Sequence, residues 1–211
     1  MRGIKFDHEN IGLTAEEFSL LKKLDTPEKI QAYISAIPQN FEPGGDSCMS
    51  VREVLRTNRA HCIEGALVAA LALWVHGELP LILDMTASSE DFDHVIAVFK
   101  QNGCWGALSK GNHAVVRYRD PVYRTLRELM MSYFHEYYNA VGVKTLRSYS
   151  SPVDMRRYKP ETWITGTDAW VVAEDLDRIK HWKLLTPAQE RALQPIDALE
   201  TKAGTIVQYK K

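Results

Sequence analysis

The sequence predicts an α+β fold in which a buried central helix packs on an antiparallel sheet. Residues 63–75 are apolar nearly all round, a pattern typical of a helix enclosed in a core. Three strand-like segments follow, at 79–85, 93–100 and 103–109. The sequence Gln-Asn-Gly between the last two predicts a tight hairpin. A helix followed by hairpin-connected strands is the order expected of α+β layers.

Two short helices are expected before this core. Thr14 is placed to cap the first, and Glu17 completes a capping box three residues later. Thr26 is placed to cap the second, with Pro27 at its first helical position. We expect these helices to form a helical N-terminal cap over residues 1–45.

The remainder of the chain is expected to pack on the same core. Residues 121–138 place apolar side chains at helical spacing, which predicts a long amphipathic helix. The signals then weaken, although 167–185 is expected to be partly helical. No Gly/Ser/Pro-rich linker is present, so we expect one domain over 1–211, with its core at 50–138 and a C-terminal extension with further helices at 139–211.

The composition is that of a globular protein and excludes several classes. Of the 211 residues, 45% are hydrophobic and 25% charged, and a net charge of −1 provides no basic footprint for nucleic acid. There is neither a signal-peptide pattern nor a run of about 18 uncharged apolar residues, so we expect a cytoplasmic protein with no membrane segment. Three cysteines without a CxxC pair favour free thiols. No phosphate loop or dinucleotide fingerprint is present, and we expect no cofactor and no metal.

Cys62 begins the apolar helix, and this position favours a reactive thiol. The unpaired N–H groups and the positive end of the helix dipole stabilise a thiolate, and they can also hold an oxyanion when the thiolate attacks a carbonyl. His94 opens the strand at 93–100 and is the best candidate base. We interpret His61 mainly as a polar cap and Glu64 as an acid that suits the dipole and pairs with an arginine.

The order of these features resembles the core of the transglutaminase-like superfamily. A cysteine opens an apolar helix (HCIEGALVAALALWVHG), a histidine opens a strand (DHVIAVFKQNG), and a third strand carries a tryptophan (CWGALS). The resemblance covers roughly Asn58 to Ser109. It implies a papain-like fold and a Cys–His–Asp triad that transfers acyl groups through a thioester. On this basis Cys62 is the nucleophile and His94 the general base.

The acid of the triad is the point at which the sequence departs from the family. The family commonly places Asp four residues after the tryptophan, and here Ser109 stands four residues after Trp105. A hydroxyl can accept the imidazole N–H but cannot stabilise an imidazolium as a carboxylate does. Asn112 is a neutral substitute of the kind that papain-like proteases use. Three hypotheses stay open: Asn112 orients His94, Ser109 does so weakly, or the triad is degenerate.

The substrate would be a peptide, amide or ester, and we expect hydrolysis rather than transfer to an amine because water is always available. Candidate substrate contacts are Asn58, Arg59, Trp105 and Arg117. The main alternative is a binding or scaffold protein that keeps the fold without the chemistry, which the serine at position 109 favours. A third hypothesis is a metal-dependent hydrolase that uses His61, His94 and His113.

Overall fold

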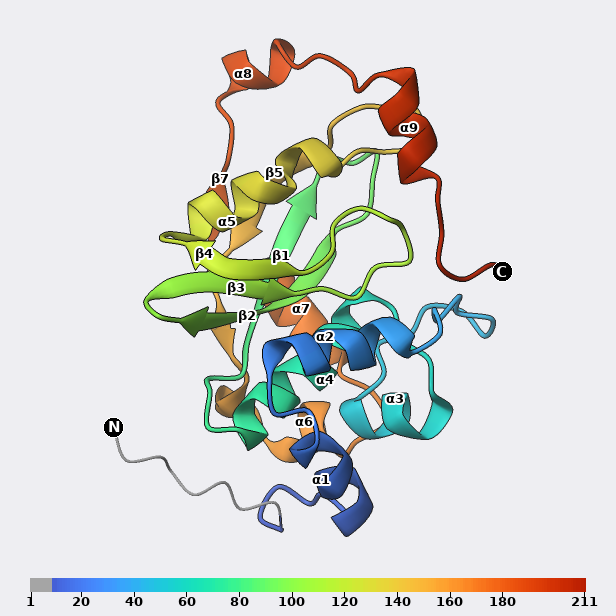
Figure 1. Ribbon diagram of the computed structural model, residues 1–211, viewed down its shortest axis with the longest axis vertical. Coiled ribbons are helices and arrows are strands. Elements are labelled where there is room, and N and C mark those ends of the chain that lie inside the picture. The colour runs from blue at the N-terminus through green and yellow to red at the C-terminus, as the bar shows by residue number, and fades with distance from the viewer. Residues whose placement is uncertain (1–8) are drawn as a thin grey trace.

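The computed structural model describes residues 9–211 and has an α+β architecture (Figure 1). Within this range, seven strands form one sheet in the order β4-β3-β2-β1-β5-β7, with β6 also paired to β1, and every pairing is antiparallel. The strands are β1 (Leu81–Ala87), β2 (His94–Gln101), β3 (Cys104–Leu108), β4 (Arg119–Tyr123), β5 (Leu146–Ser150), β6 (Val153–Asp154) and β7 (His181–Lys183). The predicted α+β class, the antiparallel sheet and the first three predicted strands are therefore confirmed.

The helices surround this sheet. They are α1 (Ala15–Lys22), α2 (Pro27–Ala36), α3 (Val51–Thr57), α4 (Cys62–Val75), α5 (Leu126–Tyr133), α6 (Pro160–Trp163), α7 (Trp170–Arg178), α8 (Pro187–Arg191) and α9 (Ala198–Gly204). Two 3₁₀ turns, Phe134–Glu136 and Met155–Arg157, complete the regular structure. Figure 1 shows α2 and α4 on one side of the sheet and α5 on the other.

The sheet has a hydrophobic core on each of its faces. Val95, Ala97 and Phe99 of β2 join the core around α4, whereas Ile96 and Val98 join the core that includes α5. Successive side chains of a strand point to opposite faces, so both sets are buried. This double burial explains why β2 reads as a continuous apolar run rather than an alternating one.

The α4 helix is the buried centre of the larger core. Residues 63–73 are all buried, and the helix packs against β1 and β2 on one side and α1, α2 and α3 on the other. Each enclosed Leu, Ile or Val side chain contributes roughly 1.5–3 kcal/mol relative to exposure. The helix ends at Val75 with His76 as its C-cap, and Gly77 follows with a φ of +86°. The predicted central helix is confirmed, with its first residue at Cys62.

Local signals also predicted the caps and the hairpin. The Glu17 amide donates to Thr14 Oγ1 at 3.1 Å and the Glu17 carboxylate accepts from the Thr14 amide at 2.8 Å, which forms the predicted capping box. Thr26 caps α2, which begins at Pro27. Asn102 and Gly103 have φ values of 51° and 81°, as a two-residue hairpin with a type I′ turn requires.

The prediction of a long helix over 121–138 is wrong. Residues up to Tyr123 form the edge strand β4, and a new helix begins after Thr125, whose hydroxyl accepts from the Glu128 amide at 3.1 Å. Pro121 is tolerated in this strand because β4 lies at an edge of the sheet. Val122, which fitted the helical spacing, is 66% exposed in the strand.

The C-terminal part of the chain contributes more than the predicted extension over 139–211. It supplies β5, β6 and β7, and β5 pairs directly with β1 in the middle of the sheet. The predicted helical segment at 167–185 contains α7 and then β7. These strands are short, so their alternation is too brief for a sequence pattern to identify.

Gly65 lets the segment after β3 approach α4 closely. A Cβ atom at this position would lie 2.4 Å from Lys110 Cβ and 2.8 Å from Lys110 Cγ. The buried Lys110 side chain runs past the helix and its ammonium donates to Ile37 O at 2.6 Å. This contact holds Ser109, the preceding residue, beside the start of α4.

We predict that Gly65→Ala destabilises the protein by about 1–3 kcal/mol, because overpacking outweighs the better helix propensity of alanine. The free energy of unfolding by chemical denaturation measures this change. Gly44→Ala is the matched control, since nothing lies within 4 Å of its added Cβ and its effect should stay within about 0.5 kcal/mol. A Gly65→Ala protein as stable as the control would show that the helix and Lys110 are not in tight contact.

Candidate functional site

Cys62 is the first residue of α4, and the residue as a whole is partly exposed. The Gly65 amide donates to His61 O at 2.9 Å and opens the hydrogen-bond ladder of the helix. The N–H groups of Cys62, Ile63 and Glu64 therefore precede the ladder and lie at the positive end of the helix dipole. A thiol in this position can lose its proton more readily than an ordinary cysteine.

Glu64 anchors the start of this helix from inside the protein. Its side chain is fully buried and accepts hydrogen bonds from four other residues. The donors are Asn40 Nδ2 at 3.1 and 3.2 Å, Ser47 Oγ at 3.1 Å, Met49 N at 2.9 Å and His61 N at 2.9 Å. The expectation that Glu64 pairs with an arginine is wrong, because its partners are neutral donors and the neighbouring imidazole. The carboxylate thereby ties the loop at 40–49 to the residue before the cysteine.

His61 lies between this carboxylate and the thiol. Its Nε2 donates to Ser47 O at 2.8 Å and lies 3.4 Å from Glu64 Oε1 and 3.7 Å from Glu42 Oε1. Because a backbone carbonyl can only accept, Nε2 carries a proton. The other ring nitrogen, Nδ1, lies 3.9 Å from Cys62 Sγ. The imidazole is thus oriented toward the sulfur.

His94 is the first residue of β2 and is oriented by Ser109. His94 Nε2 lies 2.8 Å from Ser109 Oγ, and Ser109 Oγ donates to Val116 O at 2.7 Å. The hydroxyl proton is committed to that carbonyl, so the hydroxyl accepts from His94 Nε2–H. Nδ1 of His94 is consequently the nitrogen left for proton exchange.

Two further contacts hold Ser109 in place. Gln31 of α2 binds its backbone twice, donating to Ser109 O at 2.9 Å and accepting from Ser109 N at 2.9 Å. Val116 adopts a φ of 57°, a left-handed conformation that is strained for a β-branched residue. Its amide donates to Glu136 at 3.0 Å, which helps keep its carbonyl aimed at Ser109. The backbone around the histidine partner is therefore rigidly positioned.

The two imidazoles change the acidity of the thiol. Burial would raise the pKa of Cys62, but hydrogen bonds and positive charge from His61 and His94 hold it well below its ordinary value. Burial likewise opposes protonation of His61, yet the sulfur and the Glu64 carboxylate raise its pKa to about 9. Burial and the charge of Glu64 raise the pKa of Cys48 to about 12. Of these two thiols, only Cys62 is placed to be a nucleophile near neutral pH.

The structure brings Ser109, and not Asn112, to His94. Asn112 Oδ1 accepts from Tyr209 N at 2.8 Å and Asn112 Nδ2 donates to Tyr209 O at 3.0 Å, so its amide pairs with the C-terminal segment. The hypothesis that Asn112 orients His94 is therefore wrong. The loop after Lys110 turns the Asn112 side chain toward the C-terminal segment.

Three of the four candidate substrate contacts are placed away from the thiol or are held by other groups. Arg117 donates to His113 O at 2.9 Å and to Gln208 Oε1 at 2.9 Å, so it braces the loop rather than offering a free guanidinium. Trp105 is the second residue of β3, at the end of the strand far from Ser109. The Lys100 ammonium lies 5.0 Å from the centroid of its ring. Four residues of strand, about 13 Å, separate it from Ser109.

Asn58 and Arg59 lie just before the helix start. Asn58 ends α3 in a left-handed conformation, with a φ of 49° and a ψ of 47°, and its residue is exposed. Arg59 is also exposed. Asn58 is thus used for the turn between α3 and α4. Arg59, three residues before Cys62, makes no hydrogen bond or ion pair with the other residues of the range 9–211, so it is the member of this pair that can contact a substrate.

A second acid–histidine pair, with a buried acid and a partly exposed histidine, lies near the site, and sequence reasoning missed it. His181 Nε2 of β7 lies 3.3 Å from Asp84 Oδ2 of β1. Burial, together with the charge of Asp93, raises the pKa of Asp84 to about 6. Burial also raises the pKa of Asp93, and the charge on Cys62 adds to this. Only the pairing of distant strands reveals this cluster, because 97 positions separate His181 from Asp84.

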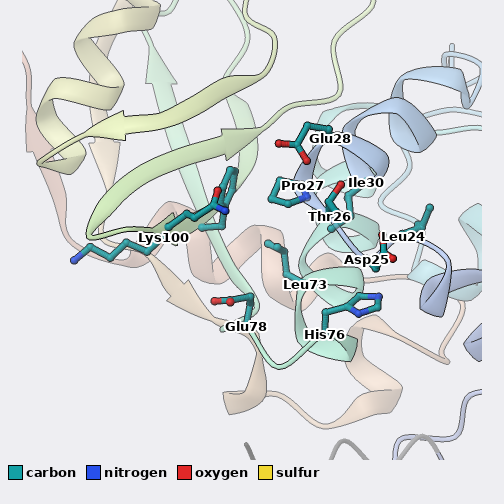
Figure 2. A pocket seen from close by; sticks show the side chains of 12 residues that line it. Leu24, Asp25, Thr26, Pro27, Glu28, Ile30, Leu73, His76, Glu78 and Lys100 are labelled. Atoms are coloured by element: carbon teal, nitrogen blue, oxygen red, sulfur yellow. The ribbon is translucent and has the colours of Figure 1, made fainter. Parts of the chain in front are cut away.

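A cavity of about 270 Å³ lies at the opposite end of α4 (Figure 2). Its walls include Thr26 and Pro27 of the α2 start, Leu73 and His76 of the α4 end, and Lys100 of β2. The 14 residues of α4 span about 21 Å, which separates this cavity from Cys62. The lining of this cavity contains no cysteine, and the thiol of the candidate site lies at the other end of the helix.

Over residues 9–211, no group of three or more His, Cys, Asp or Glu side chains is arranged to hold a metal ion. His113 Nδ1 lies 2.9 Å from Gly204 O. None of the helices in the same part of the chain has the length and apolar character needed to cross a membrane. Comparison with models of known protein families gives no match, and comparison with curated proteins gives none either.

We predict that Glu64→Ala destabilises the protein by about 3–5 kcal/mol, because it leaves several buried donors without an acceptor. Glu64→Gln should cost less, since one of its side-chain atoms still accepts. The free energy of unfolding by chemical denaturation measures both.

The control is Glu174→Ala on the exposed face of α7. Glu174 pairs with Arg178 at 3.0 Å, and both side chains are more than half exposed, so the loss should stay below about 1 kcal/mol. Equal effects of Glu64→Ala and Glu174→Ala would contradict the anchoring role.

Proposed function

We propose that this chain is a cysteine-dependent hydrolase or acyltransferase that acts on an amide or ester through a thioester. The observation that carries the proposal is the position of the Cys62 thiol at the N-terminus of a buried helix, with His61 and His94 beside it. A nucleophile, a base and preorganised N–H groups are the parts that acyl transfer needs.

The first half-reaction forms the thioester. The Cys62 thiolate attacks the carbonyl carbon, a C–S bond forms, and the π electrons move to oxygen. The N–H groups at the start of α4 hold the oxyanion. Collapse of this intermediate breaks the C–N or C–O bond, and His94 gives the leaving group its proton.

The second half-reaction releases the acyl group. His94 takes a proton from water through Nδ1, hydroxide adds to the thioester carbon, and the C–S bond breaks to return the thiolate. An amine in place of water would give transamidation by the same steps. We favour hydrolysis, because water is always at hand.

The sequence resemblance to the transglutaminase-like superfamily supports the same reading. Over Asn58 to Ser109 the order of cysteine helix, histidine strand and tryptophan strand is similar, and a papain-like arrangement of these elements forms part of the proposal. Ser109 would take the place of the family's acid as a neutral partner of His94.

The competing proposal is a binding or scaffold protein that has lost turnover. It is favoured by the neutral hydroxyl of Ser109, because a carboxylate in that position stabilises the imidazolium during catalysis. The two proposals differ in whether acyl groups turn over at Cys62.

We predict that the protein hydrolyses an activated ester such as p-nitrophenyl acetate with a Cys62-bound acetyl intermediate. Cys62→Ala should abolish turnover, because no other group replaces the thiolate. Steady-state kinetics and mass spectrometry of acid-quenched protein measure turnover and the acylated residue. Cys104→Ser is the control, since Cys104 is also partly exposed but lies at the far end of β3. Hydrolysis that survives Cys62→Ala would contradict the role of Cys62 as nucleophile, and wild-type protein with no turnover above the buffer rate would favour the scaffold.

We predict that Ser109→Ala lowers kcat by about fivefold, the effect of losing one hydrogen bond of roughly 1 kcal/mol to His94. Asn112→Ala is the matched control and should leave kcat unchanged, because that amide pairs with Tyr209. Steady-state kinetics on both variants decide between the two. A larger loss in Asn112→Ala would assign the orienting role to Asn112 instead.

A further inference from the structure

Two imidazoles flank one thiol, but the protein holds them in different ways. The partners of His94 are neutral: Ser109 Oγ accepts from its Nε2 at 2.8 Å and is itself committed to the Val116 carbonyl. The surroundings of His61 are anionic, because Glu64 and Glu42 lie 3.4 and 3.7 Å from its Nε2. The two imidazoles therefore differ in the charge of the groups that hold them.

The anionic and acceptor groups that face His61 favour its protonated form, against the opposing effect of burial. From α4 it faces Glu64 and the Cys62 sulfur, and from the loop at 40–49 it faces Glu42 and the Ser47 carbonyl. Glu64 is fully buried and cannot move away, because Asn40, Ser47, Met49 and the His61 amide hold it. A positive imidazole is therefore enclosed between a fixed carboxylate and the thiol.

The thiol has further neighbours on other elements, and they favour the neutral sulfur. The charge on Cys62 interacts with Asp93 before β2, with Tyr137 after α5 and with Cys48 in the loop at 40–49. Against these groups, a nearby positive charge is needed to keep the thiolate stable.

We infer that His61 is the fixed counter-ion of the Cys62 thiolate, and that His94 is the group that moves the proton. This inference rests on the proposed function and deepens it. The triad lacks a carboxylate beside His94, but a carboxylate, that of Glu64, is present beside His61. His61 stands one residue before the nucleophile Cys62 and three residues before Glu64. His61 is thus a positioning and charge-balancing residue, which keeps its proton through the cycle.

The proton balance is consistent with this division. His94 takes a proton from water as the thioester is hydrolysed and delivers one to the leaving group during acylation. The second proton of water leaves with the carboxylic acid, and the thiolate returns without needing a proton. No step draws on the proton of His61.

The test is the pH dependence of alkylation of Cys62 by iodoacetamide, read by mass spectrometry at each cysteine, together with turnover of the activated ester. In His61→Gln the carboxamide can still donate to Ser47 O, but the nitrogen that faces the sulfur is lost. Its alkylation midpoint should move to higher pH, with about a tenfold slower reaction at pH 6 for each pKa unit. The difference should vanish at alkaline pH, where the thiol is ionised in both proteins.

His94→Ala should behave in the opposite way. It should lose ester turnover, while the alkylation midpoint of Cys62 should move less than in His61→Gln, because the hydrogen bond and charge of His94 are lost but the counter-ion remains. A midpoint that moves at least as far in His94→Ala as in His61→Gln would overturn the inference and leave the proposed function standing. A wild-type Cys62 that is no more reactive at pH 6 than Cys104 would instead contradict the proposed function itself.

His61→Asn guards against a folding defect in His61→Gln, since it keeps a donor close to the position of Nδ1. It should recover part of the reactivity at pH 6 if a hydrogen bond contributes, and it should stay slower than wild type because it carries no charge. Full recovery by this neutral side chain would overturn the role of His61 as a counter-ion. Thermal unfolding of each variant confirms that the comparison is made on folded protein.

Discussion

The hydrogen bonds to the buried carboxylate of Glu64 are the interaction on which the candidate site depends. A carboxylate with no exposed surface is stable only if its oxygens are surrounded by donors. Here the donors come from the loop at 40–49 and from the amide of His61, the residue before α4. Because those donors include the backbone at Met49 and at His61, the loop and the helix are fixed together. The geometry of the thiol is therefore set by an acid two residues further along the chain that does not touch the reacting atoms.

A second constraint is the close approach of the segment after β3 to α4. Gly65 has no side chain, and the stem of Lys110 occupies the space that a Cβ would fill. Ser109, next to Lys110, is consequently held where it can accept from His94, and Gln31 fixes its backbone from α2. The two histidines thus depend on different parts of the fold: His61 on the loop around Glu64, and His94 on the contact between helix and strand.

Much of the fold could be predicted from local patterns, and much of the site could not. The capping box at Thr14, the apolar run of α4 and the Asn-Gly hairpin are properties of adjacent residues, so the sequence indicates them directly. The start of the segment 121–138 could not be predicted in this way. Its spacing of apolar residues fits a helix, but an edge strand ends at Tyr123 and a capping box at Thr125 begins the helix later.

The site needed information that neighbouring residues do not carry. Cys62, His94 and Ser109 could be named from their order, but the choice between Ser109 and Asn112 depends on how one loop turns. The role of Glu64 was misread because its donors, from Asn40 to Met49, become neighbours only when the loop folds back on α4. The pairing of Asp84 with His181 requires the strand order of the whole sheet.

The place of β5 in the sheet has a consequence for synthesis of the chain. One edge of β1 is paired by β2, which follows at once, but the other waits for β5, which begins at Leu146, whereas β1 ends at Ala87. At 5–20 residues per second, that interval lasts about 3–12 s. During this time an apolar strand presents open backbone groups to any neighbouring chain, the arrangement that leads to intermolecular pairing. The survival of this half-built sheet is a kinetic property of the chain, and the stability of the finished fold does not report it.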